Sequence, residues 1–381
     1  MADMRWVGTW ATSPVQTEGL SFRDQSLRII ARASLGGNRV RVRLSNAYGA
    51  AKLAVAAARI GLRDKDARIV PGSDRKLTFG GRDGISIAAG ALALSDPVEL
   101  EFPPLADLAV SLYLPGEVPE SFQITGHGNA HQTNYVSPPG DHTVAASMPV
   151  AATTENWYFL TGIDVLAPAA AGGIIAFGDS LTDGNLSSLD TNSRWPDQLT
   201  RRIAARRGGR PLGVMNHGIG GNRILHDTRG DSGLRRLDRD ALAQPGATHV
   251  IVFLGTNDLR NRWKKPEEEV TSADMIAGLQ QLAARTQAAG LKIYGCTLLP
   301  FENETFLPGA WNPTRERHRL AVNGWIREAR AFDHVIDFEK TLRDPAHPSS
   351  MKPEYDCGDH LHPSDFGYKT LGDSIDLALF D

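Results

Sequence analysis

Residues 174–184 read IIAFGDSLTDG, a short apolar run followed at once by a turn that contains Gly178 and Ser180. Such a run, bounded by glycine, is typical of a buried strand in a parallel sheet. Further runs of this kind lie at residues 212–215, 249–254, 291–296 and 334–338. Amphipathic stretches separate them at residues 195–205, 272–289 and 315–331. This alternation predicts a doubly wound parallel sheet, in which ligands bind beyond the carboxyl ends of the strands.

The sequence before this region has a different periodicity. Residues 28–33 and 40–44 alternate apolar and polar around a Gly-Gly-Asn turn, which predicts a β-hairpin with one buried face. Turn signals rich in proline and glycine separate further strand-like runs at residues 51–60, 85–88, 98–102, 108–114 and 157–166. The pattern favours an antiparallel β-sandwich or jelly roll.

The small residues APAAAGG at positions 167–173 interrupt this pattern as a linker does. We therefore expect a β-sandwich accessory domain over residues 1–167 and an α/β domain over residues 168–381.

Composition narrows the class of protein. The 381 residues carry a formal net charge of −3, with 41% hydrophobic and 22% charged residues. These values suit a soluble globular chain and give no basic surface for nucleic acid. The apolar runs are too short to span a membrane, and the first residues, MADMRW, lack the pattern of a signal peptide. Localisation stays open between the cytoplasm and secretion by a signal absent from this sequence.

Two cysteines, Cys296 and Cys357, exclude a disulfide framework and a four-cysteine zinc site. Cys296 lies in an apolar run and is expected to be a buried thiol. Cys357 lies two residues before Asp359, and we interpret it as a bystander to the chemistry considered next.

Asp359 and His362 form an acid–base candidate in the segment DHLHP at residues 359–363. A carboxylate three residues before a histidine can hold its Nδ1–H while Nε2 faces a hydroxyl. His360 is the rival base, but its side chain should diverge from that of its neighbour Asp359. A solvated turn and a metal site are the alternatives; no further histidine or cysteine cluster completes a metal site.

Two glycine-containing segments follow strands of the same sheet. Residues 216–223 (NHGIGGNR) can turn backbone N–H groups toward an oxyanion, and Asn257 in residues 255–258 (GTND) can add a side-chain amide. Ordinary turns and helix caps are the alternative interpretation of each segment, and of Ser180.

Together the four segments resemble, in order, the signature blocks of the SGNH hydrolases, also called GDSL esterases and lipases. The resemblance covers roughly residues 173–381 and implies a three-layer α/β/α sandwich on a five-stranded parallel sheet. It implies Ser180 as nucleophile, His362 as base and Asp359 as orienting acid. Its oxyanion hole combines Ser180, Gly221 and Asn257, and it needs no cofactor and no metal. The N-terminal half is similar to the all-β domain of a bacterial branch, on WVGTWA at residues 6–11 and QTNYVSPPGD at residues 132–141.

The expected function is that of a serine-dependent carboxylic ester hydrolase acting on a small-molecule or glycan ester. Carbohydrate O-acetyl groups are the first expectation and short-chain esters the second. A polysaccharide-binding protein with an inactive hydrolase domain, or a lysophospholipase or lipase, are the alternatives. Further candidates for substrate contact are His131 (with His127 nearby), His217, Arg223, Arg262, Trp263 and Trp311. The sequence does not indicate an oligomeric state.

Overall fold

A computed structural model describes residues 3–17, 21–118, 123–261, 265–307 and 309–381. The chain divides into two compact units. One comprises Met1–Ala171 with Pro211–Gly213, and the other Gly172–Arg210 with Val214–Asp381.

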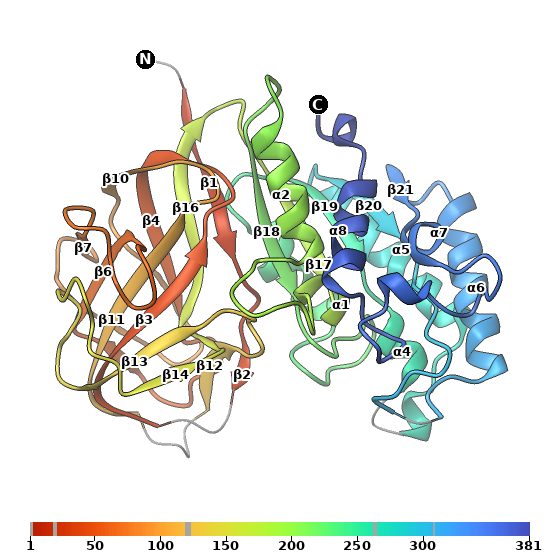
Figure 1. The fold of residues 1–381 in the computed structure, drawn as a ribbon, viewed down its shortest axis with the longest axis horizontal. Helices are drawn as coiled ribbons and strands as arrows, with labels where there is room; N and C mark the ends of the chain where they lie inside the picture. The colour runs from red at the N-terminus through yellow and green to blue at the C-terminus, as the bar shows by residue number, and fades with distance from the viewer. Residues whose placement is uncertain (1–2, 18–20, 119–122, 262–264, 308) are drawn as a thin grey trace. The chain divides into compact units, whose positions relative to one another are not determined.

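The first unit contains two main sheets whose paired strands are antiparallel (Figure 1). One sheet has the order β1 (Met4–Ala11), β16 (Leu160–Pro168), β4 (Gly37–Ser45) and β10 (Val98–Phe102), with β9 (Leu92–Leu94) also on β4. The other runs β14 (Ala152–Thr154), β13 (Asn134–Pro139), β3 (Phe22–Arg32), β11 (Asp107–Val118), β6 (Ala57–Leu62) and β7 (Arg75–Leu77). Smaller sheets pair β15 (Trp157–Tyr158), β12 (Ile124–His127) and β2 (Val15–Thr17), and β5 (Leu53–Val55) with β8 (Ile85–Ile87).

Strand β4 shows why this region folds as layered sheets. Val40, Val42 and Leu44 are fully buried, and the arginines between them are more exposed. A period of two places one face of the strand in the core, as the alternation predicts. The expected all-β N-terminal region is confirmed.

The hairpin predicted for residues 28–44 is wrong. Strand β3 pairs with β11 and β13, whereas β4 lies in the other sheet beside β16 and β10. The residues between them bond elsewhere: Ala33 N–H donates to Ala106 O (2.9 Å) and Ser34 N–H to Thr9 O (2.8 Å). The chain therefore crosses from one sheet to the other instead of turning back.

The second unit contains a sheet in the order β18 (Leu212–Gly218), β17 (Gly172–Gly178), β19 (Ala247–Phe253), β20 (Lys292–Cys296) and β21 (His334–Ile336). The pairs from β17 to β21 are parallel. On one face α2 (Trp195–Ala205) packs against α8 (Asp365–Ser374), which packs against α7 (Phe338–Leu342). In the other helix layer, α5 (Ser272–Ala288) packs against both α3 (Gly233–Leu237) and α6 (Pro313–Glu328). Figure 1 labels α5 and α6.

This arrangement confirms the five-stranded, three-layer fold. Short helices complete the unit: α1 (Ser180–Asp183), α4 (Thr256–Arg260), η1 (Asp238–Leu242), η2 (Pro266–Glu268), η3 (Pro353–Tyr355) and η4 (Leu377–Phe380). The strand order reverses beside β17, so the residues that follow β17 lie where such sheets bind ligands.

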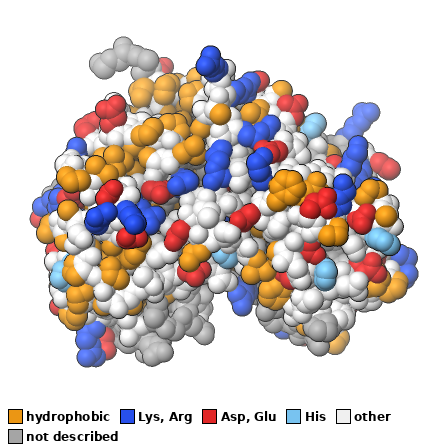
Figure 2. Space-filling model, in the orientation of Figure 1, with side chains coloured by type: hydrophobic (Ala, Val, Ile, Leu, Met, Phe, Trp, Pro, Cys, Tyr) orange, Lys and Arg blue, Asp and Glu red, His pale blue; other side chains and the backbone are white. Residues whose placement is uncertain are grey.

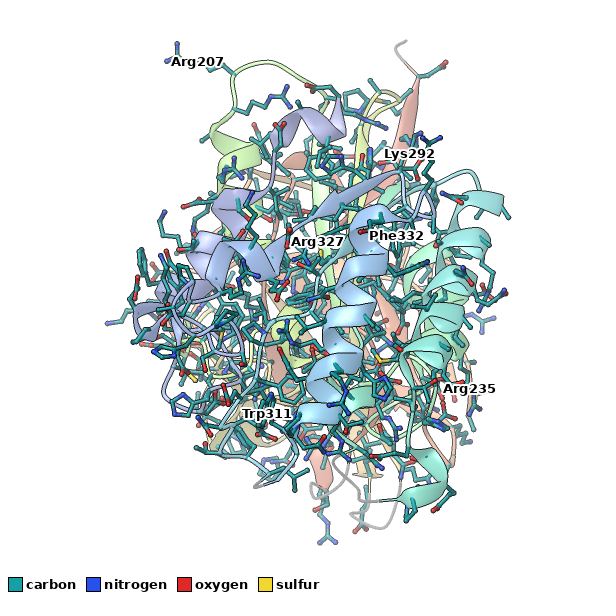
Figure 3. All side chains as sticks on the ribbon, turned by 90° about the vertical axis from the view of Figure 1, so that its right-hand side faces the viewer. Arg207, Arg235, Lys292, Trp311, Arg327 and Phe332 are labelled. Carbon is teal, nitrogen blue, oxygen red and sulfur yellow. The ribbon has the colours of Figure 1, made fainter. Side chains whose placement is uncertain are left out.

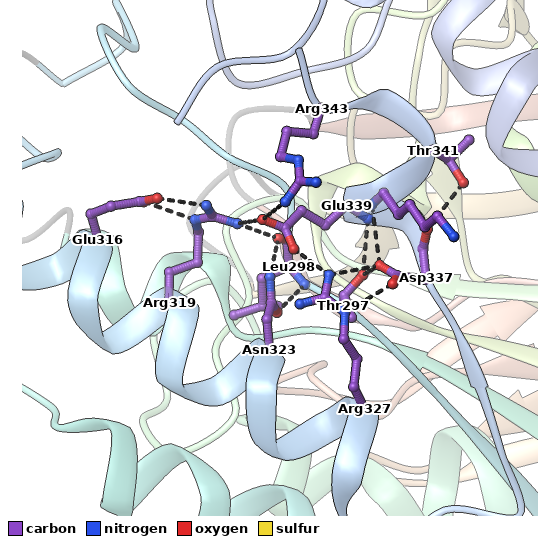
Figure 4. A network of polar contacts seen from close by, with 11 residues as sticks. Thr297, Leu298, Glu316, Arg319, Asn323, Arg327, Asp337, Glu339, Thr341 and Arg343 are labelled. Carbon is purple, nitrogen blue, oxygen red and sulfur yellow. Dashed lines mark hydrogen bonds and ion pairs between the residues drawn. The ribbon is translucent and has the colours of Figure 1, made fainter. Parts of the chain in front are cut away.

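A buried ionic network fixes the chain where it leaves β20 (Figure 4). Arg319 Nη1 donates to Glu339 Oε1 at 2.9 Å, and both side chains are fully buried. Arg327 also bonds to Glu339. Asn323 exchanges two hydrogen bonds with the backbone of Leu298, at 2.7 and 2.9 Å. Helices α6 and α7 thus anchor the start of the long loop between β20 and α6.

Acidic and basic side chains are interspersed across the face drawn in Figure 2, as the small net charge suggests. No helix among the described residues is long and apolar enough to cross a membrane.

Candidate active site

Ser180 lies in the turn that directly follows the buried strand β17. Every residue of β17 is buried. A Cβ at Gly178 would lie 2.4 Å from Phe253 O, so only glycine fits where the chain turns. Asp179 caps α1 by accepting from Leu181 N–H at 3.0 Å. Ser180 is the first helical residue, where the backbone N–H has no partner within the helix.

Ser180, His362 and Asp359 form a continuous chain of hydrogen bonds. Ser180 Oγ lies 2.9 Å from His362 Nε2, and His362 Nδ1 lies 2.6 Å from Asp359 Oδ2. All three residues are buried, with 6% of Ser180 exposed to solvent. The structure therefore brings together the three residues that the sequence proposed for acid–base and nucleophilic chemistry.

The surroundings of Asp359 keep it ionised. Burial alone would raise its pKa, but the hydrogen bond and electrostatic attraction of His362 and two backbone N–H groups outweigh it and lower the pKa to about 2. The backbone donors are those of Leu361 and His362, at 2.9 and 2.7 Å from Oδ1. A carboxylate held in this way fixes the Nδ1–H tautomer of the histidine.

His360 points to a different partner. Its Nδ1 lies 2.7 Å from Asp356 Oδ2, and half of its side chain is exposed. The two histidines of this segment therefore diverge, and only His362 contacts Ser180.

Gly221 offers a backbone N–H beside helix α1. Its φ of +79° is a left-handed conformation that favours glycine. The neighbouring amides are occupied: Gly220 N–H donates to Asp183 Oδ2 at 3.1 Å and Asn222 N–H to Ile219 O at 3.0 Å. Within the described part of the chain, the Gly221 N–H has no acceptor.

Asn257 and Asp258 tie the third strand end to the same loop. Asn257 Nδ2 donates one hydrogen to Asn222 O at 3.1 Å, and the second hydrogen remains for a ligand. Asp258 accepts from Ile224 and Leu225 N–H at 2.8 and 3.1 Å. The Ser180 turn, the Gly221 loop and Asn257 are thereby linked through successive hydrogen bonds.

Three further residues lie at this site that the sequence did not predict. Arg260 Nη1 donates to Asn257 Oδ1 at 2.9 Å, and Glu304 accepts from Arg260. The ring of Phe306 packs edge-on against the imidazole of His362, with centroids 5.5 Å apart. The spacing of Arg260, one helical turn after Asn257, was the only sequence signal for this group.

The substrate-contact candidates have different outcomes. His217 and Arg223 lie in the interior, 1% and 0% exposed, and their contact with a substrate stays a prediction. Arg223 bonds to Glu268, at 2.5 Å from Nη1 to Oε2. Trp311 lies directly before the N-cap of α6 (Figure 3), and its contact with a substrate stays a prediction. Arg262 and Trp263 lie outside the described residues.

Two candidates belong to the β-sheet unit. His127 is buried and its Nδ1 lies 2.8 Å from Ser13 O. His131 adopts a left-handed backbone conformation, with φ of +48°. Its contact with a substrate stays a prediction.

Among the described residues, one group has the spacing to hold a metal ion, formed by Asp356, Cys357 and Asp359. Burial raises the pKa of Cys357 to about 12, which keeps its thiol protonated. Asp359 already accepts from His362, and Asp356 from His360. A metal would have to displace these partners, so the donor set fits an ion poorly.

Comparison with known proteins connects this geometry to a family. Solved structures to which this chain is similar include an aryl esterase from M. smegmatis (17% identity, 53% of this chain and 95% of that chain, TM-score 0.42). An esterase, EstA, from Pseudoalteromonas sp. has 22% identity over 53% of this chain and 93% of that chain, with a TM-score of 0.40. A lipase/acylhydrolase from Enterococcus faecalis has 24% identity over 53% and 92%, with a TM-score of 0.41. No curated protein matches the chain.

The model of the GDSL-like lipase/acylhydrolase family matches residues 176–370, which is half of the sequence. That range contains the Ser180 turn, the Gly221 loop, Asn257 and the segment from Asp359 to His362. The chain therefore belongs to the GDSL-like lipase/acylhydrolase family and is an ester hydrolase.

Proposed function

We propose that Ser180 is the nucleophile of this hydrolase, His362 its general base and Asp359 the residue that orients His362. The observation that carries the proposal is the pair of contacts from Ser180 Oγ to His362 Nε2 (2.9 Å) and from His362 Nδ1 to Asp359 Oδ2 (2.6 Å). A nucleophile, a base and an orienting group within hydrogen-bond distance are what acyl transfer requires.

In the first step His362 Nε2 takes the proton of Ser180 Oγ while Oγ attacks the ester carbonyl carbon. The carbonyl oxygen becomes an oxyanion, which we assign to the Ser180 and Gly221 N–H groups and the second Asn257 Nδ2 hydrogen. Fixed donors at this point stabilise charge that develops only near the transition state.

His362 then returns the proton to the departing alcohol, which leaves an acyl group on Ser180 Oγ. Water attacks this acyl-enzyme in the same way, with His362 as base. The second collapse releases the carboxylic acid and restores the hydroxyl of Ser180. His362 takes and returns the proton in each step, and the oxyanion-hole groups only donate hydrogen bonds.

For the substrate we propose short acyl esters, with O-acetyl groups of carbohydrates first. A cavity of about 500 Å³ supports this class; it is lined by Arg260, Asn261, Pro266, Glu269, Leu307, Gly309, Ala310 and Arg315. Arg260 contacts Asn257, and Leu307 follows Phe306, which touches His362. The lining includes three charged side chains and an amide, which can hydrogen-bond to the hydroxyl groups of an alcohol.

The test measures acetate released from acetylated xylan, pectin and chitin oligomers, beside p-nitrophenyl esters of increasing acyl length. We expect release from at least one glycan and a decline in kcat/KM with acyl length. Preference for long acyl chains would favour a lipase or lysophospholipase instead.

Ser180→Ala is the control for the mechanism. It should abolish both ester hydrolysis and covalent labelling by a fluorophosphonate without lowering the melting temperature. Labelling that persists in this variant would remove Ser180 from its proposed role.

A further inference from the structure

We propose that Glu304 is a positioning residue, which acts through Arg260 to hold the side-chain amide of Asn257 in the orientation that the oxyanion hole requires. This inference rests on the proposed role of Asn257. It adds to that role a buried ionic pair that the four sequence blocks do not contain.

The side-chain amide of Asn257 has two chemically different ends. Only the Nδ2 end of Asn257 can donate to an oxyanion, so a flipped amide would present an oxygen and repel it. Arg260 Nη1 donates to Asn257 Oδ1 at 2.9 Å. A guanidinium can only donate, and a flipped amide would place NH₂ against it. Arg260, together with the Asn222 carbonyl that accepts from Nδ2 at 3.1 Å, therefore selects the orientation in which Nδ2 is available.

Arg260 is in turn held by Glu304. Its Nε and Nη2 both donate to Glu304 Oε1, at 3.1 and 2.9 Å. The side chains of Arg260 and Glu304 are 4% and 1% exposed. A buried guanidinium needs a charged partner, because one left unpaired carries a large desolvation penalty. Glu304 thus sets where the Arg260 fork lies, and through it where Asn257 points.

The segment that contains Glu304 also contacts Asp359 and His362. Thr305 N–H donates to Asp359 O at 3.0 Å, and the Phe306 ring packs on His362. Glu304 Oε2 also accepts from Leu307 N–H at 3.2 Å, which closes the segment on itself. Residues 304–307 therefore contact Asp359 and His362 directly and Asn257 through Arg260.

The experiment starts from Glu304→Gln, which keeps the shape of the side chain and removes its charge. We expect kcat on p-nitrophenyl acetate to fall by about 10-fold to 10²-fold, the scale of a misplaced catalytic group, with KM within about threefold. Arg260→Lys is the second variant. Its ammonium lacks the planar fork with which Arg260 reaches Glu304 Oε1 from Nε and Nη2 and Asn257 Oδ1 from Nη1, so kcat should fall although the charge is kept.

A double-mutant cycle with Asn257→Ala distinguishes the proposed positioning role of Glu304 from a merely structural role. If Glu304 acts through Asn257, Glu304→Gln should change kcat by less than about threefold once Asn257 is alanine. An equal loss of kcat in both backgrounds would overturn the proposal, and so would an unchanged kcat in either single variant.

Asp164→Asn is the control. Asp164 is another fully buried carboxylate that pairs with an arginine, Arg41, at 3.1 Å, but it lies on β16 in the β-sheet unit and not in the loop that contains Glu304. The substitution should lower the melting temperature and leave kcat within about threefold. Fluorophosphonate labelling of Ser180 in every variant keeps the two proposals apart. Absence of labelling in the wild-type chain would refute the nucleophile, whereas the cycle addresses Glu304 alone.

Discussion

His362 Nε2 lies 2.9 Å from Ser180 Oγ, although 182 positions separate the two residues in the chain. His360, two residues before His362, faces Asp356 and is half exposed. The segment thus contains two histidines, each with its own carboxylate, of which one contacts the serine.

This difference predicts opposite results for two alanine substitutions. His362→Ala should lower kcat by about 10⁴-fold to 10⁶-fold, because no other group there accepts the Ser180 proton. His360→Ala should leave kcat within about threefold, since its half-exposed imidazole pairs with Asp356 and does not contact Ser180. Steady-state kinetics on p-nitrophenyl acetate measure both. Comparable losses in the two variants would contradict the assignment of the base.

Removal of the oxyanion-hole amide should affect turnover more than binding. We expect Asn257→Ala to lower kcat by about 10²-fold to 10³-fold with a much smaller change in KM, as for a donor used mainly in the transition state. Single-turnover acylation is the appropriate readout. An unchanged acylation rate would mean that another group supplies this donor.

Asp179 makes stability depend on pH in an unusual direction. Burial, with help from the nearby Asp258 carboxylate, raises the pKa of Asp179 from 3.8 to about 7. Between these values the folded state holds a proton that the unfolded chain releases, so the free energy of unfolding should fall as pH rises from about 4 to 7. Asp179→Asn should remove this contribution and still cap Leu181 N–H.

The measurement compares thermal unfolding of the wild type and of Asp179→Asn at pH 5 and pH 8. We expect the loss of melting temperature between the two pH values to be smaller in the variant. Because all other titrating groups are shared, an identical loss in both proteins would contradict the raised pKa of Asp179.

Activity should survive chelation of metal ions. Asp359, the one member of the Asp356–Cys357–Asp359 group that lies in the proposed mechanism, accepts hydrogen bonds on both oxygens from within the protein. Prolonged incubation with a chelator, followed by removal of the chelator and assay, should leave kcat/KM unchanged. A loss that zinc or manganese restores would instead support a metal at this group.

The parallel sheet was predictable because its strands are buried on both faces and read as short apolar runs. Helix α2 matches the amphipathic stretch predicted at residues 195–205, since its pattern is local. The antiparallel part was harder to predict. The run at residues 51–60 is two strands, broken at Ala56, whose N–H donates to Tyr113 O. Pairing of this kind joins distant residues and leaves no local signal.

The residues of the site also divide into those with a local sequence signal and those without one. The four sequence blocks contain Ser180, Gly221, Asn257 and His362, and the structure places them along linked hydrogen bonds, while their roles stay proposals. Glu304 and Phe306 lie in a loop without a motif, and only tertiary contacts show that they reach the site. His217 is buried on β18, and its contact with a substrate stays a prediction, because the sequence of a strand does not tell which face is covered.

The spacing between the serine and its base also orders events during biosynthesis. At roughly 5–20 residues per second, the ribosome adds His362 about 10–35 s after Ser180. A growing chain can therefore expose a folded Ser180 turn that has no base and no reactivity. With His362 as the proposed base, we expect hydrolytic activity to begin only after the segment that carries it docks against the Ser180 turn.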